Sequence, residues 1–226
     1  MDLCKACCAL LVFLLLSTVQ GCADKKPSPN SVEGQYELFN NLFPHSLDTV
    51  HIDVYEDFTC PACQQFANDF EPALIAAYGE RLQIRKHYLV GSRSPVSAQI
   101  LYEVAKEKGA GELASQRLFA AKLDHHNAAT NAPVVERIAA DMGLLAAYKD
   151  ASSNPAITKK IRTAWNTEGA HIAFFPSVVV ENVLLTNSNP ENLNTIINSL
   201  LKQPMVQVSI SPLADDKVRV RTDQDQ

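Results

Sequence analysis

The 226-residue sequence has no block of basic residues and no acidic tail. Its formal net charge is −5, and the acidic and basic residues are scattered along the chain. Binding to nucleic acid requires a basic patch, so no nucleic-acid partner is expected. No internal repeat is visible. Apolar residues make up 46% and charged residues 20% of the chain, which indicates one globular domain of generous size or a smaller domain with an insertion.

The most apolar stretch, residues 9–16, is too short to cross a membrane. A spanning helix needs about 20 apolar residues, so a secretory signal over residues 1–21 is the better interpretation. Lys5 supplies a weak positive charge before the stretch. A buried helix is disfavoured because neither a polar stripe nor a helix cap accompanies the run.

Residues 19–22, Val-Gln-Gly-Cys, resemble the bacterial lipobox, although Gln20 is unusual at its position. The resemblance implies cleavage before Cys22 and acylation of its sulfur and amine. Two or more acyl chains anchor a protein stably at a membrane. Residues 22–34 would then be a lipid anchor and a polar tether. The alternative is ordinary secretion, which leaves Cys22 as a free thiol.

Cysteine is scarce in the rest of the chain. Of six cysteines, three lie in the predicted signal and Cys22 is assigned to the lipid, which leaves Cys60 and Cys63. A disulfide framework would need several bridges at wide spacing. A bridge between residues three positions apart closes too small a loop to stabilise a domain of this size. The pair is therefore predicted to have a chemical function.

Hydrophobic periodicity predicts a β–α–β unit around this pair. Residues 50–55 alternate between apolar and polar side chains, residues 66–77 carry apolar side chains at near-helical spacing, and residues 82–90 are again strand-like. Because the connection is short, the two strands should be parallel. Residues 35–39 are expected to form a short edge strand.

Residues 94–170 are predicted to be an insertion made of helices. Additional helical pieces are expected at residues 113–123 and 144–148. Three helices should start where a capping residue precedes proline and end near a glycine. The starts are Ser94-Pro95, Asn131-Ala132-Pro133 and Asn154-Pro155, and the ends are Gly109, Gly143 and Gly169.

Strand patterns return after the helices. Residues 177–180 and 183–186 should pair as a hairpin, with Glu181-Asn182 as a two-residue turn. Asn189-Pro190 then opens an amphipathic helix. Residues 204–226 are an appendage whose position the sequence does not predict.

The motif Cys60-Pro61-Ala62-Cys63 lies where the first strand ends and a helix begins. Unpaired amides and the helix dipole favour a thiolate at a helix N-terminus, so Cys60 is predicted to have a lowered pKa and to be the attacking sulfur. Cys63 lies one turn further along and would resolve the mixed disulfide. Proline suits the first turn of the helix.

A CxxC motif can also be half of a metal site or an inert surface bridge. Zinc or copper would need two further ligands, and the only cysteine left to supply one is Cys22. His87 or the pair His125-His126 could be proposed as ligands, but adjacent histidines in a loop are usually solvated. No metal or cofactor is therefore predicted.

The order of elements resembles the DsbA-like branch of the thioredoxin superfamily. The resemblance covers residues 50–201 and implies an α/β thioredoxin fold in two parts, residues 35–93 and 171–203, with a helical domain inserted at residues 94–170. It also implies periplasmic oxidation of thiols to disulfides. The residues and elements that carry it are Asp57-Phe58-Thr59-Cys60-Pro61-Ala62-Cys63, the helical insertion, Phe175-Pro176-Ser177, the hairpin and the last helix.

The resemblance maps Pro176 onto the cis-proline loop that faces the CxxC motif. A cis bond there would aim the backbone of Phe175 at a substrate strand, which could pair with it by strand addition. Phe58, Phe174 and Phe175 could form an apolar rim for unfolded clients. The alternative is packing in the core, which is the better interpretation for Phe174.

The sequence departs from the family pattern at two positions. Strongly oxidising members have histidine where this chain has Ala62, so a very oxidising potential is not expected. Many members keep a buried acid where this chain has Val54. Asp53, Glu56 and Asp57 are nearby candidates for proton transfer with Cys63, with Asp57 weakly favoured. Each would otherwise be a solvated residue of a loop or a strand end.

The sequence therefore predicts thiol–disulfide exchange with reduced exported proteins, most simply as an oxidase. The partners would be these clients and a membrane redox protein, with a quinone-linked oxidase expected. The location would be the periplasmic side of a bacterial membrane, reached through the lipid on Cys22. Two alternatives stay open: a reductase or isomerase, and a metal chaperone or client-binding lipoprotein.

Replacing Cys22 with serine tests the anchor. The Cys22→Ser variant should be released from membranes while its thiol exchange stays intact, because the tether takes no part in the chemistry. Membrane fractionation and mass spectrometry of the N-terminal peptide would measure this. Unmodified protein that begins before Ala23 and still sediments with membranes would contradict the expectation.

Overall fold

The computed structural model describes residues 32–38, 48–91, 94–124, 126–167, 169 and 172–202. The predicted signal, the predicted lipidation site Cys22 and the appendage at residues 204–226 lie outside the described residues. The end of the predicted tether lies inside them. There Val32 is buried, and the backbone N–H of Glu33 donates to Ser199 Oγ at 2.9 Å. The chain thus contacts its last helix before the first strand begins.

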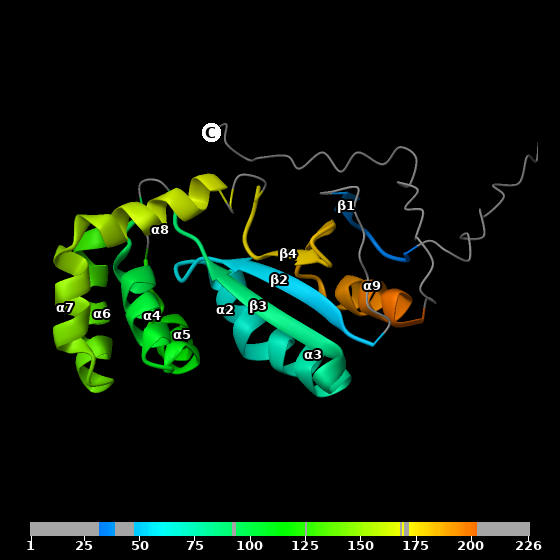
Figure 1. Ribbon diagram of the computed structural model, residues 1–226, viewed down its shortest axis with the longest axis horizontal. Helices are drawn as coiled ribbons and strands as arrows, with labels where there is room; N and C mark the ends of the chain where they lie inside the picture. The colour runs from blue at the N-terminus through cyan, green and yellow to red at the C-terminus, as the bar shows by residue number, and fades with distance from the viewer. Residues whose placement is uncertain are drawn as a thin grey trace, which may run out of the picture.

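A mixed five-stranded sheet forms the centre of the molecule, with the strands in the order β1-β5-β4-β2-β3 (Figure 1). Strands β2 and β3 are parallel, as predicted, and the other neighbouring pairs are antiparallel. The alternating pattern of residues 50–55 accounts for β2, whose apolar side chains point into the core. The strands are β1 (Glu37–Leu38), β2 (Val50–Glu56), β3 (Leu82–Tyr88), β4 (Ser177–Val180) and β5 (Leu184–Asn187).

A single helical path joins β2 to β3. It consists of α2 (Pro61–Gln65), a π-helical turn (Phe66–Phe70), α3 (Glu71–Tyr78) and a 3-10 turn (Gly79–Arg81). The π turn is defined by the N–H of Glu71, which donates to the carbonyl oxygen of Phe66 five residues earlier. Phe66 and Leu74 pack in a first core against β2 and the last helix, α9 (Pro190–Lys202).

The hairpin forms at the predicted place with a slightly longer connection. Three residues separate β4 from β5 rather than two, and Val183 N–H donates to Val180 O at 3.0 Å. Glu181 and Asn182 both have positive φ, of 53° and 59°. Asn tolerates this conformation better than most residues do, and a turn with two positive φ angles matches the twist of paired strands.

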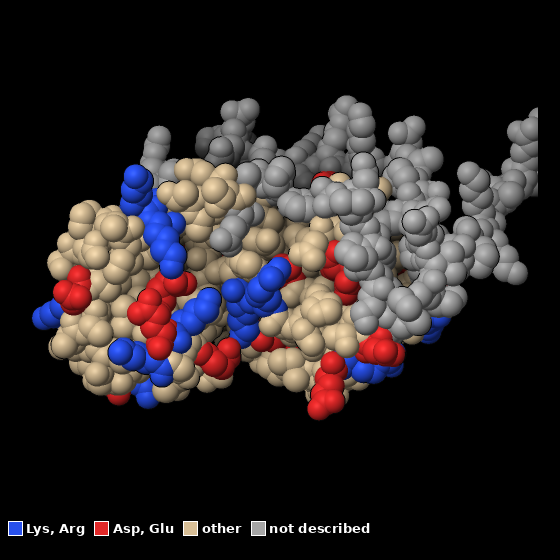
Figure 2. Space-filling model, viewed as in Figure 1, with Lys and Arg blue, Asp and Glu red and all other residues tan. Residues whose placement is uncertain are grey.

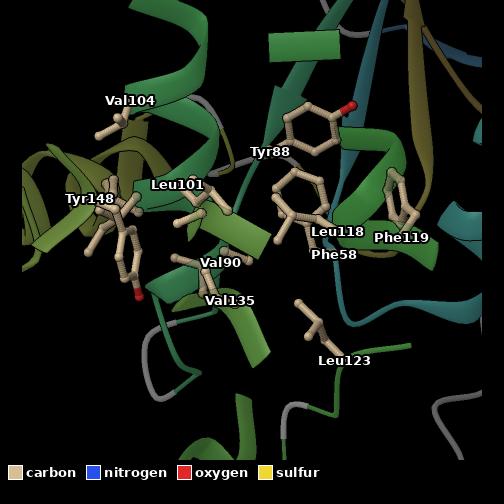
Figure 3. Packing of buried hydrophobic residues seen from close by; sticks show 14 of the residues in the cluster. Phe58, Tyr88, Val90, Leu101, Val104, Leu118, Phe119, Leu123, Val135 and Tyr148 are labelled. Atoms are coloured by element: carbon tan, nitrogen blue, oxygen red, sulfur yellow. The ribbon is translucent and has the colours of Figure 1, made fainter. Parts of the chain in front are cut away.

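Five helices form the insertion, which lies at one end of the sheet (Figure 1). They enclose a second core that is centred on α4 and shown in Figure 3. Figure 2 shows basic and acidic side chains interspersed over one face of the molecule. The helices are α4 (Ser97–Glu107), α5 (Gly111–Ala120), α6 (Ala128–Asp141), α7 (Leu145–Ser153) and α8 (Pro155–Thr167).

The proline-based starts are right for one helix of the insertion and wrong for two. Helix α8 begins at Pro155, and Asn154 Oδ1 accepts from Ala156 N–H at 3.0 Å. Helix α4 begins three residues after Ser94, whose backbone N–H instead closes a turn onto Gly91 O. Helix α6 begins at Ala128 rather than Asn131, since the alanines that precede Asn131 extend the helix.

Asn131 does not cap the start of α6, although the sequence predicted that it would. Its side chain is buried inside α6 and bonds to both the N–H and the carbonyl of Asp124. Pro133 lies within the same helix, which therefore lacks one backbone donor. The Asn131 amide therefore bonds the backbone of Asp124, in the segment before α6, to the helix.

Candidate active site

A short turn connects β2 to the helix that carries the two cysteines. Asp57 Oδ1 accepts hydrogen bonds from the N–H of Thr59 at 2.8 Å and from its hydroxyl at 2.6 Å. The carbonyl of Asp57 accepts from Cys60 N–H at 3.0 Å. These bonds fix the turn, so the chain reaches Cys60 in an extended conformation with the helix starting at the next residue.

Cys60 is the N-cap of α2, and its thiol is partly exposed. Its sulfur accepts from the backbone N–H of Cys63 at 3.3 Å. Hydrogen bonding from the Cys63 thiol is the largest cause that lowers the pKa of Cys60, and the N–H groups of Cys63 and Ala62 add to it. Burial opposes them, and the pKa is lowered to about 7. At neutral pH a large fraction of Cys60 is therefore a thiolate.

Cys63 lies one turn further into the helix and is fully buried. Burial strongly raises the pKa of its thiol, and the neighbouring Cys60 and Glu56 raise it further. The two sulfurs are not bonded to one another in the structure. The helix thus presents one sulfur that is accessible and readily ionised and a second that is sequestered and protonated.

The loop before β4 brings a second segment of the chain to Cys60. The peptide bond between Phe175 and Pro176 is cis, as the resemblance implied. The Cys60 thiol donates to the carbonyl oxygen of Phe175 at 3.6 Å. Residues 115 positions apart in the sequence are therefore adjacent at the reactive sulfur.

The three phenylalanines assigned to an apolar rim have different environments. Phe58 is buried in the second core, where its ring stacks on Tyr88 with centroids 4.2 Å apart (Figure 3). Phe174 is 38% exposed, so its expected burial in the core is wrong. Phe175 is partly buried beside Cys60. Whether Phe175 and Pro176 bind substrate stays a prediction.

The acids near the cysteines are buried rather than solvated. Asp57 is engaged in the turn, and its role in proton transfer stays a prediction. Asp53 is bonded to Arg85 and to His87, whose Nε2 lies 2.6 Å from Asp53 Oδ1. Burial raises the pKa of Asp53, but these hydrogen bonds outweigh it and keep the pKa below its usual value.

Glu56 is the most unusual of the acids. It is fully buried, and neither carboxylate oxygen has a hydrogen-bond partner among the residues that the structure describes. Burial raises its pKa to about 8, and the charge of Glu71 contributes while Lys86 opposes it. The sequence held a signal for this, because Glu56 continues the alternation that places Val50, Ile52 and Val54 on the buried side of β2.

One ion cluster could not be foreseen from the sequence. Lys86 on β3 places its ammonium 2.8 Å from Glu71 Oε1 and 3.0 Å from Glu112 Oε2. The cluster joins the sheet, α3 and the insertion helix α5. A second tie runs from Gln64 Nε2 to the carbonyl of Phe119 at 2.6 Å. No local pattern marks these partners, since each pair is far apart in the chain.

Within the described residues, no group of three or more histidine, cysteine or acidic side chains is arranged to hold a metal ion. His87 is turned to Asp53, and the backbone N–H of His126 donates to Asp124 Oδ1. His125 lies outside the described part of the chain. No described helix combines the length and the apolar character that crossing a membrane requires.

Comparison with known proteins gives one family and a set of structural neighbours. The thioredoxin family matches residues 48–199. No curated protein matches the sequence. DsbA proteins are among the similar solved structures. The three described below are 12–17% identical to this chain and share its fold, which is a thioredoxin-like sheet with an inserted helical region.

Three neighbours indicate the extent of this similarity. Alpha-DsbA1 of Wolbachia pipientis has a TM-score of 0.55 at 15% identity, covering 68% of this chain and 86% of that one. The oxidoreductase DsbA of Xylella fastidiosa has a TM-score of 0.53 at 17% identity, covering 74% and 92%. A variant of Pseudomonas aeruginosa DsbA has a TM-score of 0.54 at 12% identity, covering 74% and 94%.

The contrast between the two sulfurs can be tested by alkylation. Cys60 should react with iodoacetamide with a midpoint near pH 7, whereas Cys63 should not react in the folded protein. The Cys63→Ala variant should raise the pKa of Cys60, because it removes the thiol that donates to the sulfur. Cys63→Ser is the matched control, since its hydroxyl can still donate. A wild-type midpoint at or above the ~8.5 of free cysteine would contradict the assignment.

The buried Glu56 should make stability depend on pH. Its pKa is raised to about 8 in the folded protein from ~4.3 in an unfolded chain, so the native state retains a proton that the unfolded state has lost between these values. The free energy of unfolding should therefore fall as pH rises from about 5 to about 8, by up to about 4 kcal/mol.

Glu56→Gln should flatten this dependence, because the amide mimics the neutral acid at every pH. Urea unfolding across the pH range would measure it, with the exposed Glu107→Gln as control. Parallel curves for the wild type and Glu56→Gln would show that Glu56 is not the group responsible.

Proposed function

We propose that this chain, which belongs to the thioredoxin family, is an oxidase that forms disulfides in exported proteins. It would do so by thiol–disulfide exchange with its own disulfide between Cys60 and Cys63. The observation that carries the proposal is the contrast between the two sulfurs. An accessible thiol with a pKa near 7 lies one turn from a fully buried thiol with a raised pKa. Structural cysteines are inert and buried, whereas reactive ones combine exposure with a lowered pKa.

The exchange follows from this arrangement in two steps. A client thiolate attacks Cys60 Sγ of the oxidised protein, which breaks the bond between the cysteines and leaves Cys63 to take up a proton. A second client thiolate then attacks the client sulfur of the mixed disulfide and releases Cys60 as a thiolate. Two electrons pass from the client to the protein. Because its thiol has the lower pKa, Cys60 is a better leaving group than Cys63.

The direction of electron flow is supported by the same hydrogen bonds. An oxidant must have a stable reduced form, and the donors around Cys60 stabilise its thiolate. Ala62 lies at the position between Pro61 and Cys63 and adds neither charge nor a side-chain donor. This feature favours a milder oxidant, and it is the observation that keeps a reductase or isomerase as the second candidate.

We place this activity on the periplasmic side of a bacterial membrane, with the lipid on Cys22 as the anchor. An oxidase must pass its two electrons onward to be used again. A quinone-linked membrane oxidase would accept them, and a lipid-anchored protein would remain close to it. Disulfides persist in such oxidising compartments, which agrees with an exported protein.

The reduction potential of the cysteine pair tests the proposal. Equilibration with glutathione should give a value above the roughly −270 mV of thioredoxin and below the roughly −120 mV of the strongest oxidants. Ala62→His should shift the potential upward, because a cation beside the sulfur favours the thiolate. A wild-type potential at or below that of thioredoxin would favour the reductase and overturn the oxidase.

A further inference from the structure

Trp165 is the only tryptophan in the chain, and it lies beside the reactive loop. It belongs to α8 of the insertion, and its ring packs on that of Phe175 with centroids 5.8 Å apart and planes inclined at 54°. The carbonyl of Phe175 accepts from the Cys60 thiol. One aromatic residue therefore separates the indole from the residue that reacts.

Gly169 leaves the room in which the indole lies. A Cβ atom on this buried glycine would lie 3.2 Å from Trp165 Cε3, 2.7 Å from the Trp165 carbonyl oxygen and 2.9 Å from Leu89 Cδ1. Leu89 belongs to the core and cannot give way easily. The space that a side chain would fill is thus occupied by the Trp165 ring, its carbonyl oxygen and the core, so glycine is the residue that fits there.

Phe174 directly precedes Phe175 in the chain. Phe174 is one of three large apolar residues that are well exposed among those the structure describes. The other two, Ile75 and Leu113, lie on α3 and α5. Residues 164–167 and 172–177 carry no charged side chain. We call Trp165, Phe174 and Phe175 the aromatic ridge.

We propose that the aromatic ridge receives an aromatic or large apolar side chain next to the client's reactive cysteine, with Trp165 as the residue that determines this preference. The inference rests on the proposed thiol exchange, because a client sulfur must then reach Cys60. Neighbours of that cysteine lie within about 4–7 Å along an extended chain. They are therefore brought against Phe175 and the rings that flank it.

The chemistry of the ridge selects the occupant. Aromatic rings prefer offset or inclined contacts with other rings, and such contacts stabilise beyond the apolar area that they bury. A charged side chain would lose water beside Trp165 and Phe174 without finding a partner among the uncharged residues of these segments. Clients with an aromatic residue beside cysteine should therefore form the mixed disulfide fastest.

Two dithiol peptides that differ only in phenylalanine or serine before the first cysteine test this. The oxidised wild-type protein should react about three- to tenfold faster with the phenylalanine peptide. Trp165→Ala should lower the rate with the phenylalanine peptide at least about threefold more than it lowers the rates with the serine peptide and with reduced glutathione, which removes the advantage. Trp165→Phe should retain most of the advantage. Leu113→Ala is the matched control, as an exposed apolar residue outside the ridge, and should behave like the wild type.

Fluorescence of the single tryptophan gives a readout that does not depend on a Trp165 variant. With the Cys63→Ala protein, the mixed disulfide of Cys60 with the phenylalanine peptide should change the emission more than that with the serine peptide. Equal emission changes, or an equal loss of all three rates in Trp165→Ala, would overturn the role of Trp165. A wild-type protein that fails to react even with glutathione would instead refute the thiol exchange itself.

Discussion

Phe58 ties the redox centre to the helical insertion, and the geometry of the site depends on this contact. The residue lies two positions before Cys60, yet its ring is enclosed by Tyr88, Phe119 and Tyr102, with centroids 4.2, 5.1 and 6.0 Å away. Cys63 packs in the same core. The segment that carries both sulfurs therefore packs against the insertion as well as against the sheet.

This seating explains how two chemically identical side chains acquire different properties. The bonds from Thr59 to Asp57 end the strand and start the helix at the position where Cys60 receives its amide donors. One turn later the helix enters the core, and Cys63 loses contact with water. Ionisable groups gather behind this point, with Glu56 unpartnered and Lys86 held between Glu71 and Glu112. The two thiols differ in pKa mainly because Cys63 is fully buried whereas Cys60 is partly exposed.

The sequence correctly predicted the elements that depend on interactions between residues close together in the chain. Alternation predicted β2, the motif placed Cys60 at a helix start, and Asn154-Pro155 marked a true N-terminus. The same reasoning was wrong at Asn131, where the upstream alanines extend the helix and the Asn131 side chain bonds to the backbone of Asp124 instead. Proline after a capping residue permits a helix start, but the surrounding packing selects it.

The environments of aromatic residues depended on contacts that no local pattern contains. Phe58 and Phe174 are the same residue type beside the same site, and one is buried while the other is exposed. The indole of Trp165 meets Phe175 across a loop, with Gly169 leaving the room for it. The expectation that Glu56 is a solvated strand-end residue was also wrong, although its position in the alternation of β2 carried a local signal for burial.

The π turn at Phe66–Phe70 has a consequence for how this chain can change over evolutionary time. It contains one residue more than an α-helical turn, and each residue rotates a helix by roughly 100°. That extra residue lets one helical path present Cys63 to the insertion and Leu74 to the sheet. Deleting one residue from this turn would rotate either Cys63 or Leu74 away from its core, even if all the other side chains were unchanged. Substitutions in this stretch can be gradual, but its length is fixed by the two cores that it serves.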